Sequence, residues 1–191
     1  MTLDERHTIQ SSWAPVSRPA PTLLIGLGNP ILGDDAVGWR IVESVEGSIS
    51  GDPRYHTRYR PLDSKSIQQN SNVEVDYLSL GGLSLMERIL GYDRVILVDS
   101  METGLKPPGS VSTYSLADLP NPSAGHSASA HDTSLMTALQ TAEAIGAKIP
   151  AQVDIVAVEA IQTFQFSEEL SETVSQAVPE AVNAVFDLLN K

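Results

Sequence analysis

A strand that turns through glycines into a helix is the feature that most constrains the fold of this chain. The apolar run Thr22–Leu27 has the character of a buried strand, and Ala36–Val45 places apolar side chains at helical spacing. The connecting turn reads Gly28-Asn29-Pro30-Ile31-Leu32-Gly33-Asp34-Asp35. This unit is typical of α/β proteins, which place their function at the carboxyl ends of strands.

Two adjacent carboxylates, Asp34 and Asp35, lie where this turn enters the helix. Backbone N–H groups and the helix dipole attract anions there, but these carboxylates already occupy that field. The pair therefore favours a cation site over a phosphate site. Because one helix cap needs one side chain, we expect one of the two acids to be structural and the other functional.

The rest of the chain alternates between strand and helix patterns, which predicts a three-layer α/β/α sandwich around a mostly parallel, twisted sheet. Further strands are expected at Val73–Leu80, Arg94–Asp99, Ser110–Tyr114 and Val153–Val158, and helices at Leu83–Leu90, Leu135–Ile145 and Val174–Leu189. Pro179 is expected to kink the last helix or to begin its main segment.

Length and composition fit one domain. The 191 residues, 41% of them apolar, suit a single α/β domain over residues 22–191, with a long surface loop at 48–72. Residues 1–21 have the composition of a flexible or loosely packed leader and lack a signal-peptide pattern. Since no segment is long and apolar enough to span a bilayer, we expect a cytoplasmic protein.

Charge and cysteine content exclude several classes of partner and site. The net charge of −12 argues against nucleic-acid and anionic-membrane partners, which require a basic surface. The absence of cysteine excludes disulfides, thiolate metal sites and cysteine nucleophiles. Any metal must therefore be held by histidine and carboxylate side chains.

Asp35, Asp99 and His131 form a candidate metal site. Asp35 follows the first strand, Asp99 ends the third, and His131 lies just before a helix, so the fold could bring all three to one edge of the sheet. Two carboxylates and one imidazole suit a borderline divalent metal with open coordination positions. Spacing alone leaves a structural role open, because an aspartate after a strand is more often a cap or turn residue.

Several motifs in order resemble the nickel–iron hydrogenase maturation endopeptidases, over about residues 23–189. The opening run Gly26–Gly38 is similar to that family's first motif, and Val95–Asp99 to its second acidic strand end. Further likenesses are the turn Pro108-Gly109-Ser110-Val111, the histidine loop Ser129-Ala130-His131-Asp132-Thr133-Ser134-Leu135 and the segment Phe166-Ser167-Glu168-Glu169-Leu170-Ser171 before the final helix. The resemblance implies a phosphorylase/hydrolase-like α/β sandwich.

The resemblance also implies an activity. The family removes a C-terminal extension from the hydrogenase large-subunit precursor after nickel insertion, which would make this chain a metal-dependent, aspartic-type endopeptidase. Asp35, Asp99 and His131 would contact nickel supplied by the substrate, and Asp34 would be the helix cap. The same donors suit another divalent metal in the isolated protein.

One segment departs from the family pattern. The run Ser79-Leu80-Gly81-Gly82-Leu83 lacks the acid and the threonine of the family's Asp-x-Gly-Thr motif, which leaves open a homologue that binds the nickel precursor as a chaperone without cutting it. Gly81 and Gly82 are candidates for lining the substrate groove. His126 is a further candidate for this groove, since His131 lies closer to the helix start and is the better ligand.

The turn Gly26–Pro30 also resembles that of peptidyl-tRNA hydrolases. That family follows the turn with a tyrosine and a His-Asn pair, which this chain lacks, and it needs a basic face for tRNA. An esterase of this kind is therefore the weaker alternative.

Overall fold

The computed structural model describes residues 21–50, 72–79, 81–118, 130–161 and 163–191, and for residues 130–134 it describes the backbone alone. The strands are β1 (Thr22–Leu27), β2 (Val73–Leu78), β3 (Arg94–Met101), β4 (Val111–Ser115) and β5 (Gln152–Glu159). The helices are α1 (Val37–Ser50), α2 (Gly82–Ile89), α3 (Ala130–Ala144) and α4 (Glu172–Leu189), with short 3-10 helices η1 (Gly33–Ala36) and η2 (Leu116–Asp118).

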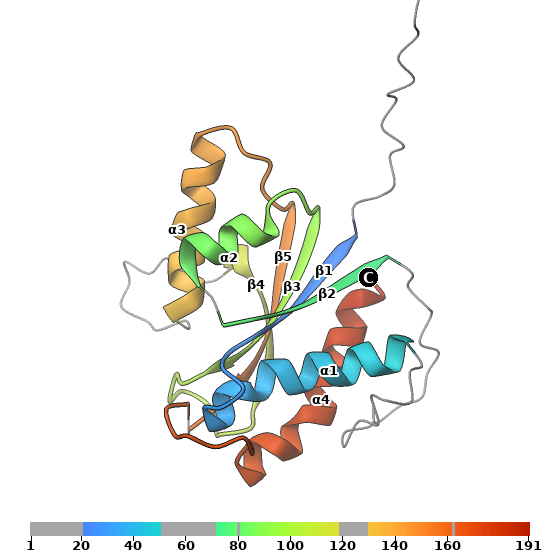
Figure 1. Cartoon of the computed structure of the whole chain (residues 1–191), viewed down its shortest axis with the longest axis vertical. Helices are drawn as coiled ribbons and strands as arrows, with labels where there is room; N and C mark the ends of the chain where they lie inside the picture. The colour runs from blue at the N-terminus through green and yellow to red at the C-terminus, as the bar shows by residue number, and fades with distance from the viewer. Residues whose placement is uncertain (1–20, 51–71, 80, 119–129, 162) are drawn as a thin grey trace, which may run out of the picture.

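The five strands form one sheet in the order β2-β1-β3-β5-β4. All neighbouring pairs are parallel except β4 with β5, which confirms the expected mostly parallel sheet. In the register between β1 and β3, Gly26 pairs with Val98. The carboxyl ends of these two central strands therefore meet at the same edge of the sheet (Figure 1).

Helices cover both faces of the sheet, which confirms the three-layer sandwich. Helices α1 and α4 lie on one face, and α2 and α3 on the other (Figure 1). Side chains of β3 alternate between the two layers: Ile96 and Val98 pack in the core with α1 and α4, whereas Val95 and Leu97 pack with α2 and α3. Both cores are aliphatic, as expected for strands that are buried on two faces.

Several element boundaries differ from the sequence prediction. Helix α1 continues through Ser50, so the first residues of the loop expected at 48–72 are helical. The expected strand Val73–Leu80 ends at Leu78, and the helix expected from Leu135 begins at Ala130. Pro179 lies inside the helix Glu172–Leu189 and does not begin it.

Parts of the expected leader and loop, residues 1–20 and 51–71, lie outside the described residues. Within the ranges that the structure describes, no helix has both the length and the apolar character needed to cross a bilayer.

Asp34 is fully buried and connects η1 to the start of α4. Its carboxylate accepts hydrogen bonds from Ser171 N–H at 2.7 Å, from Ser171 Oγ–H at 3.0 Å and from Ile161 N–H at 3.4 Å. Ser171 is itself the N-cap of α4, since its hydroxyl accepts from Val174 N–H. Asp34 therefore stabilises the start of a helix 137 residues away in the chain.

The expectation that Asp34 caps the helix that it precedes is wrong. The residue before η1 is Leu32, which makes no side-chain cap, and Asp34 lies within η1 itself. Because the tight turn directs this carboxylate into the protein, it meets donors from the segments before α4 and after β5. The acid is structural, as predicted, but it serves a different helix.

We expect Asp34→Ala to destabilise the protein strongly, because it leaves the N–H groups of Ser171 and Ile161 without their acceptor. Loss of a partner costs about 1–3 kcal/mol for each buried group that stays unsatisfied. Urea unfolding measures the change in the free energy of unfolding. The control is Asp187→Ala, an exposed aspartate on α4, and an equal loss in both variants would contradict the assignment.

Candidate active site

Asp35 and Asp99 are linked through one serine at the carboxyl edge of the sheet. Ser100 Oγ–H donates to Asp35 Oδ1 at 3.1 Å, and Ser100 N–H donates to Asp99 Oδ1 at 2.8 Å. Asp99 and Ser100 are buried, with 1% and 7% of their surface exposed, whereas Asp35 is partly exposed. Ser100 thus contacts both aspartates that the sequence singled out, Asp35 across the fold and Asp99 as its neighbour in the chain.

A close approach between helix α1 and the sheet places Asp35 next to Ser100. A Cβ atom at Gly38 would lie 2.3 Å from Val98 O and 2.4 Å from Leu27 O, so only glycine allows this contact. Those carbonyls belong to β3 and β1, the two strands that meet at this edge. The first turn of α1 therefore lies directly against both strands, and the residues before it reach β3.

The glycine turn before α1 completes the environment of Asp35. Gly28 has φ of +117°, and a Cβ there would lie 1.8 Å from Asp35 O. This conformation lets Asn29 N–H donate to Asp35 Oδ2 at 2.6 Å. Ser79 Oγ–H donates to Gly28 O at 2.7 Å, so the residue after β2 supports the turn as well. Both oxygens of Asp35 thus have a hydrogen-bond donor that fixes the carboxylate.

His131 lies in the first turn of α3, not in a loop before the helix as expected. Helix α3 packs on the face of the sheet to which Asp99 belongs by strand alternation, because Leu135 shares a core cluster with Leu97 and Met101. The His131 side chain and the whole of His126 lie outside the described part of the structure. Their roles as ligand and groove residue stay predictions.

Among the side chains that the structure describes, no three from histidine, aspartate and glutamate form a group that could hold a metal ion. The His131 side chain is not among them, so the set of Asp35, Asp99 and His131 stays a prediction. What the described residues provide is a pair of carboxylates linked by Ser100. Such oxygen donors fit a divalent cation.

Gly81 and Gly82 follow the carboxyl end of β2, at the same edge of the sheet as Asp35. Gly81 is the residue before α2, with extended backbone, and Gly82 has a positive φ of +57°. Leu83, which stands where the family has a threonine, is 63% exposed. The departure from the family motif therefore places an apolar side chain on this surface.

Glu159 is a buried acid that the sequence analysis missed. Only 6% of it is exposed, and it accepts hydrogen bonds from Thr103 N–H at 2.8 Å, Thr103 Oγ1–H at 2.7 Å and Gly104 N–H at 2.7 Å. It fixes the segment that follows β3. A signal existed, because Glu159 directly follows the apolar run of the expected strand Val153–Val158. Asp99 was expected to end its strand in the same way, but β3 continues through Ser100 to Met101, and Ser100 carried no signal beyond its position next to Asp99.

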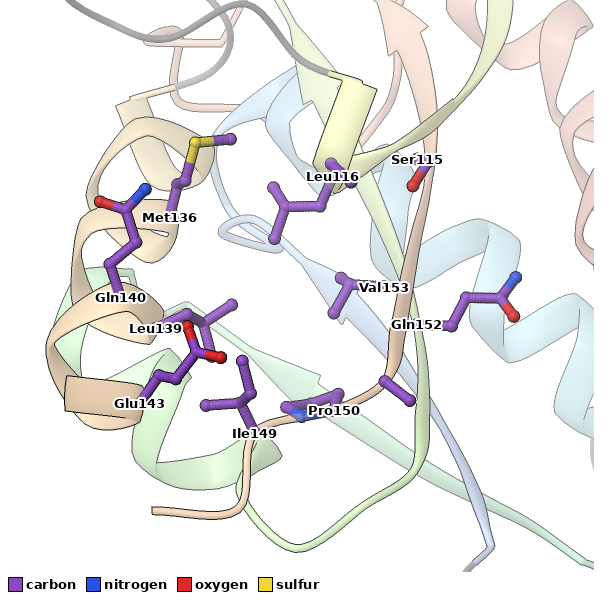
Figure 2. Close-up of a pocket in the computed structure, with 12 residues that line it drawn as sticks. Ser115, Leu116, Met136, Leu139, Gln140, Glu143, Ile149, Pro150, Gln152 and Val153 are labelled. Carbon is purple, nitrogen blue, oxygen red and sulfur yellow. The ribbon is translucent and has the colours of Figure 1, made fainter. Parts of the chain in front are cut away.

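A cavity of about 500 Å³ lies at the other end of the sheet. Figure 2 shows it between α3 and the amino end of β5, with Met136, Leu139 and Val153 directed toward it. Its lining is mostly apolar, whereas Asp35 and Asp99 lie at the carboxyl ends of the strands. This cavity is therefore separate from the paired acids.

Comparison with known proteins agrees with the fold. Two curated relatives are both described as the hydrogenase expression/formation protein HupD. The protein from Rhizobium leguminosarum bv. viciae is 23% identical over 172 residues, which cover 90% of this chain and 75% of the relative. The protein from Thiocapsa roseopersicina is 21% identical over 167 residues, which cover 87% of this chain and 66% of the relative.

Solved structures share the architecture. The hydrogenase maturating endopeptidase HybD from E. coli matches with a TM-score of 0.65 and 24% identity, covering 89% of this chain and 92% of that chain. A hydrogenase 2 maturation peptidase from Thaumarchaeota archaeon SCGC_AB-539-E09 matches with a TM-score of 0.56 and 26% identity. The match covers 88% of this chain and 97% of that chain. The five-stranded sheet with helices on both faces is thus the fold of these peptidases.

The model of one protein family matches residues 64–188, which is more than half of the chain. That family is described as HycI, hydrogenase maturation protease. This match decides between the two families that the first glycine turn resembles and leaves no support for a peptidyl-tRNA hydrolase. The chain belongs to the hydrogenase maturation protease family.

Proposed function

We propose that this protein is an endopeptidase that removes the C-terminal extension of a nickel–iron hydrogenase large-subunit precursor after nickel insertion. The observation that carries the proposal is the link from Asp35 through Ser100 to Asp99 at the carboxyl edge of the sheet. This is the edge at which α/β proteins place their ligands. Family membership supplies the class of reaction, peptide hydrolysis in hydrogenase maturation.

In this proposal, the nickel ion is part of the substrate. Asp35, Asp99 and His131 contact the nickel in the precursor and orient the scissile peptide beside it. A divalent ion in such a position polarises a carbonyl group or activates water. The protein then needs no nucleophile of its own, which agrees with a chain that has no cysteine.

The geometry of Asp35 supports a role in contacting a cation. Each of its oxygens accepts one hydrogen bond, from Asn29 N–H and from Ser100 Oγ–H. A carboxylate group offers about four acceptor positions, so with respect to the part of the chain that the structure describes both oxygens retain a free one. The two donors thus hold the carboxylate in place and leave it able to bind a cation.

The surroundings of this reaction are part of the proposal. The partner is the hydrogenase large-subunit precursor and the compartment is the cytoplasm. The net charge of −12 argues against nucleic acid and anionic membranes as partners. Gly81, Gly82 and His126 line the groove for the substrate peptide. In the isolated protein the same donors take up another divalent metal.

We expect Asp35→Asn, Asp99→Asn and His131→Gln each to slow cleavage of the nickel-loaded precursor at least about a hundredfold, the scale of losing one electrostatic contact in the transition state. Intact-mass spectrometry of the precursor measures the loss of its C-terminal extension. The control is Asp187→Asn on the exposed side of α4. A variant at any of the three positions that cleaves at the wild-type rate removes that residue from the site.

We also expect the nickel-free precursor to be cleaved at least about a hundredfold more slowly than the loaded one, since metal polarisation supplies several kcal/mol and about 1.4 kcal/mol is tenfold in rate. A time course with both precursors measures the ratio. Equal rates would overturn nickel recognition. A stable complex with the loaded precursor whose mass stays unchanged would instead identify a chaperone that does not cut.

A further inference from the structure

Large apolar side chains are exposed on the loops beside the candidate active site. Phe164 and Phe166, two of the three phenylalanines in the chain, are 85% and 82% exposed. Ile161 on the same loop is 55% exposed, and Ile31 on the glycine turn is 47% exposed. We call these four residues the apolar rim. Exposed apolar groups that gather in one region commonly mark an interaction site.

Hydrogen bonds hold the two loops of the apolar rim together. Ser167 N–H donates to Ile31 O at 3.1 Å, and Gly33 N–H donates to Ser167 O at 2.8 Å. The buried Asp34 accepts from Ile161 N–H at the other end of the same loop. Figure 1 shows the segment between β5 and α4 beside the start of α1. The apolar rim is therefore built next to Asp35, the residue that follows Asp34.

A further hydrogen bond attaches this loop to the segment after β3. Thr163 Oγ1–H donates to Glu102 Oε1 at 2.6 Å, and Thr163 is only 9% exposed. The loop that carries Phe164 is thus attached on both sides, to the turn before α1 and to the segment that follows Asp99 and Ser100. A loop whose backbone is held in this way loses little conformational entropy when a partner binds.

Acidic residues border the apolar rim. Glu168 and Glu169, directly after Ser167, are exposed, and so is Glu102. The chain as a whole carries a net charge of −12. An apolar surface with an acidic border is complementary to a segment whose apolar side chains are flanked by lysine or arginine.

We propose that the apolar rim, Ile31, Ile161, Phe164 and Phe166, is the docking surface for an apolar segment of the large-subunit precursor that is flanked by basic residues. Docking there places the scissile peptide at the neighbouring Asp35 and Asp99. This inference rests on the proposed function. Because these contacts are equally strong in the ground state and the transition state, the apolar rim sets KM and leaves kcat unchanged.

The test is steady-state cleavage of the nickel-loaded precursor by the double variant Phe164→Ser/Phe166→Ser. We expect KM to rise about tenfold or more, as for the loss of an aromatic anchor at an interface, with kcat close to wild type. Because both side chains are exposed, the melting temperature stays unchanged. The matched control is Ile145→Ser, which removes a side chain that is 80% exposed at the far end of α3.

A second variant tests the acidic border. Glu168→Lys places a positive charge beside Phe166, and we expect it to raise KM at low salt and to lose that effect at high salt, since ions screen exposed charges. A KM that is the same in wild type and Glu168→Lys at low salt would overturn the charge argument.

The outcomes separate this proposal from the proposed function. If wild type cleaves the precursor and the double variant has the same KM, or if Ile145→Ser raises KM equally, the docking surface is wrong and the proposed function stands. If wild type does not cleave the loaded precursor at all, the proposed function fails. If the double variant turns a wild-type dimer into a monomer in sedimentation without changing KM, the apolar rim binds a second copy of the chain, which also overturns the proposal.

Discussion

The close contact between α1 and the two central strands is the constraint on which the candidate active site depends. The contact exists because Gly38 has no side chain, so the carbonyls of Leu27 and Val98 approach the helix backbone. It brings the end of the glycine turn across β1 to β3, where Ser100 reaches Asp35. A larger residue at position 38 would move the helix away from the sheet and separate Asp35 from Ser100.

The order of strands and helices could be predicted from the sequence because apolar residues repeat at the spacing of each element. Element ends were less predictable. The apolar pattern of α3 starts at Leu135, which packs in the core with Leu97, whereas its first turn from Ala130 carries no such pattern. Apolar spacing marks the part of a helix that faces the core and misses a polar turn that extends beyond it.

The site could be predicted in part. Asp35 and Asp99 were placed at one edge because the ends of neighbouring parallel strands must meet. The hydrogen bond from Ser100 to Asp35 could not be predicted, because it depends on how closely the start of α1 approaches β3. The partner of Asp34 was equally hidden, since Ser171 lies 137 residues further along the chain and only the tertiary fold brings it near.

Two neighbouring acids with separate tasks have a consequence for genetics. A substitution at Asp34 removes an acceptor for the start of α4, so the cell would contain less folded protein and degrade the remainder. A substitution at Asp35 leaves that contact intact, so under the proposed function an inactive protein would persist at normal abundance and still bind the precursor. The substitution at Asp34 would be recessive beside an intact copy of the gene. The substitution at Asp35 would instead interfere with the protein made from the intact copy.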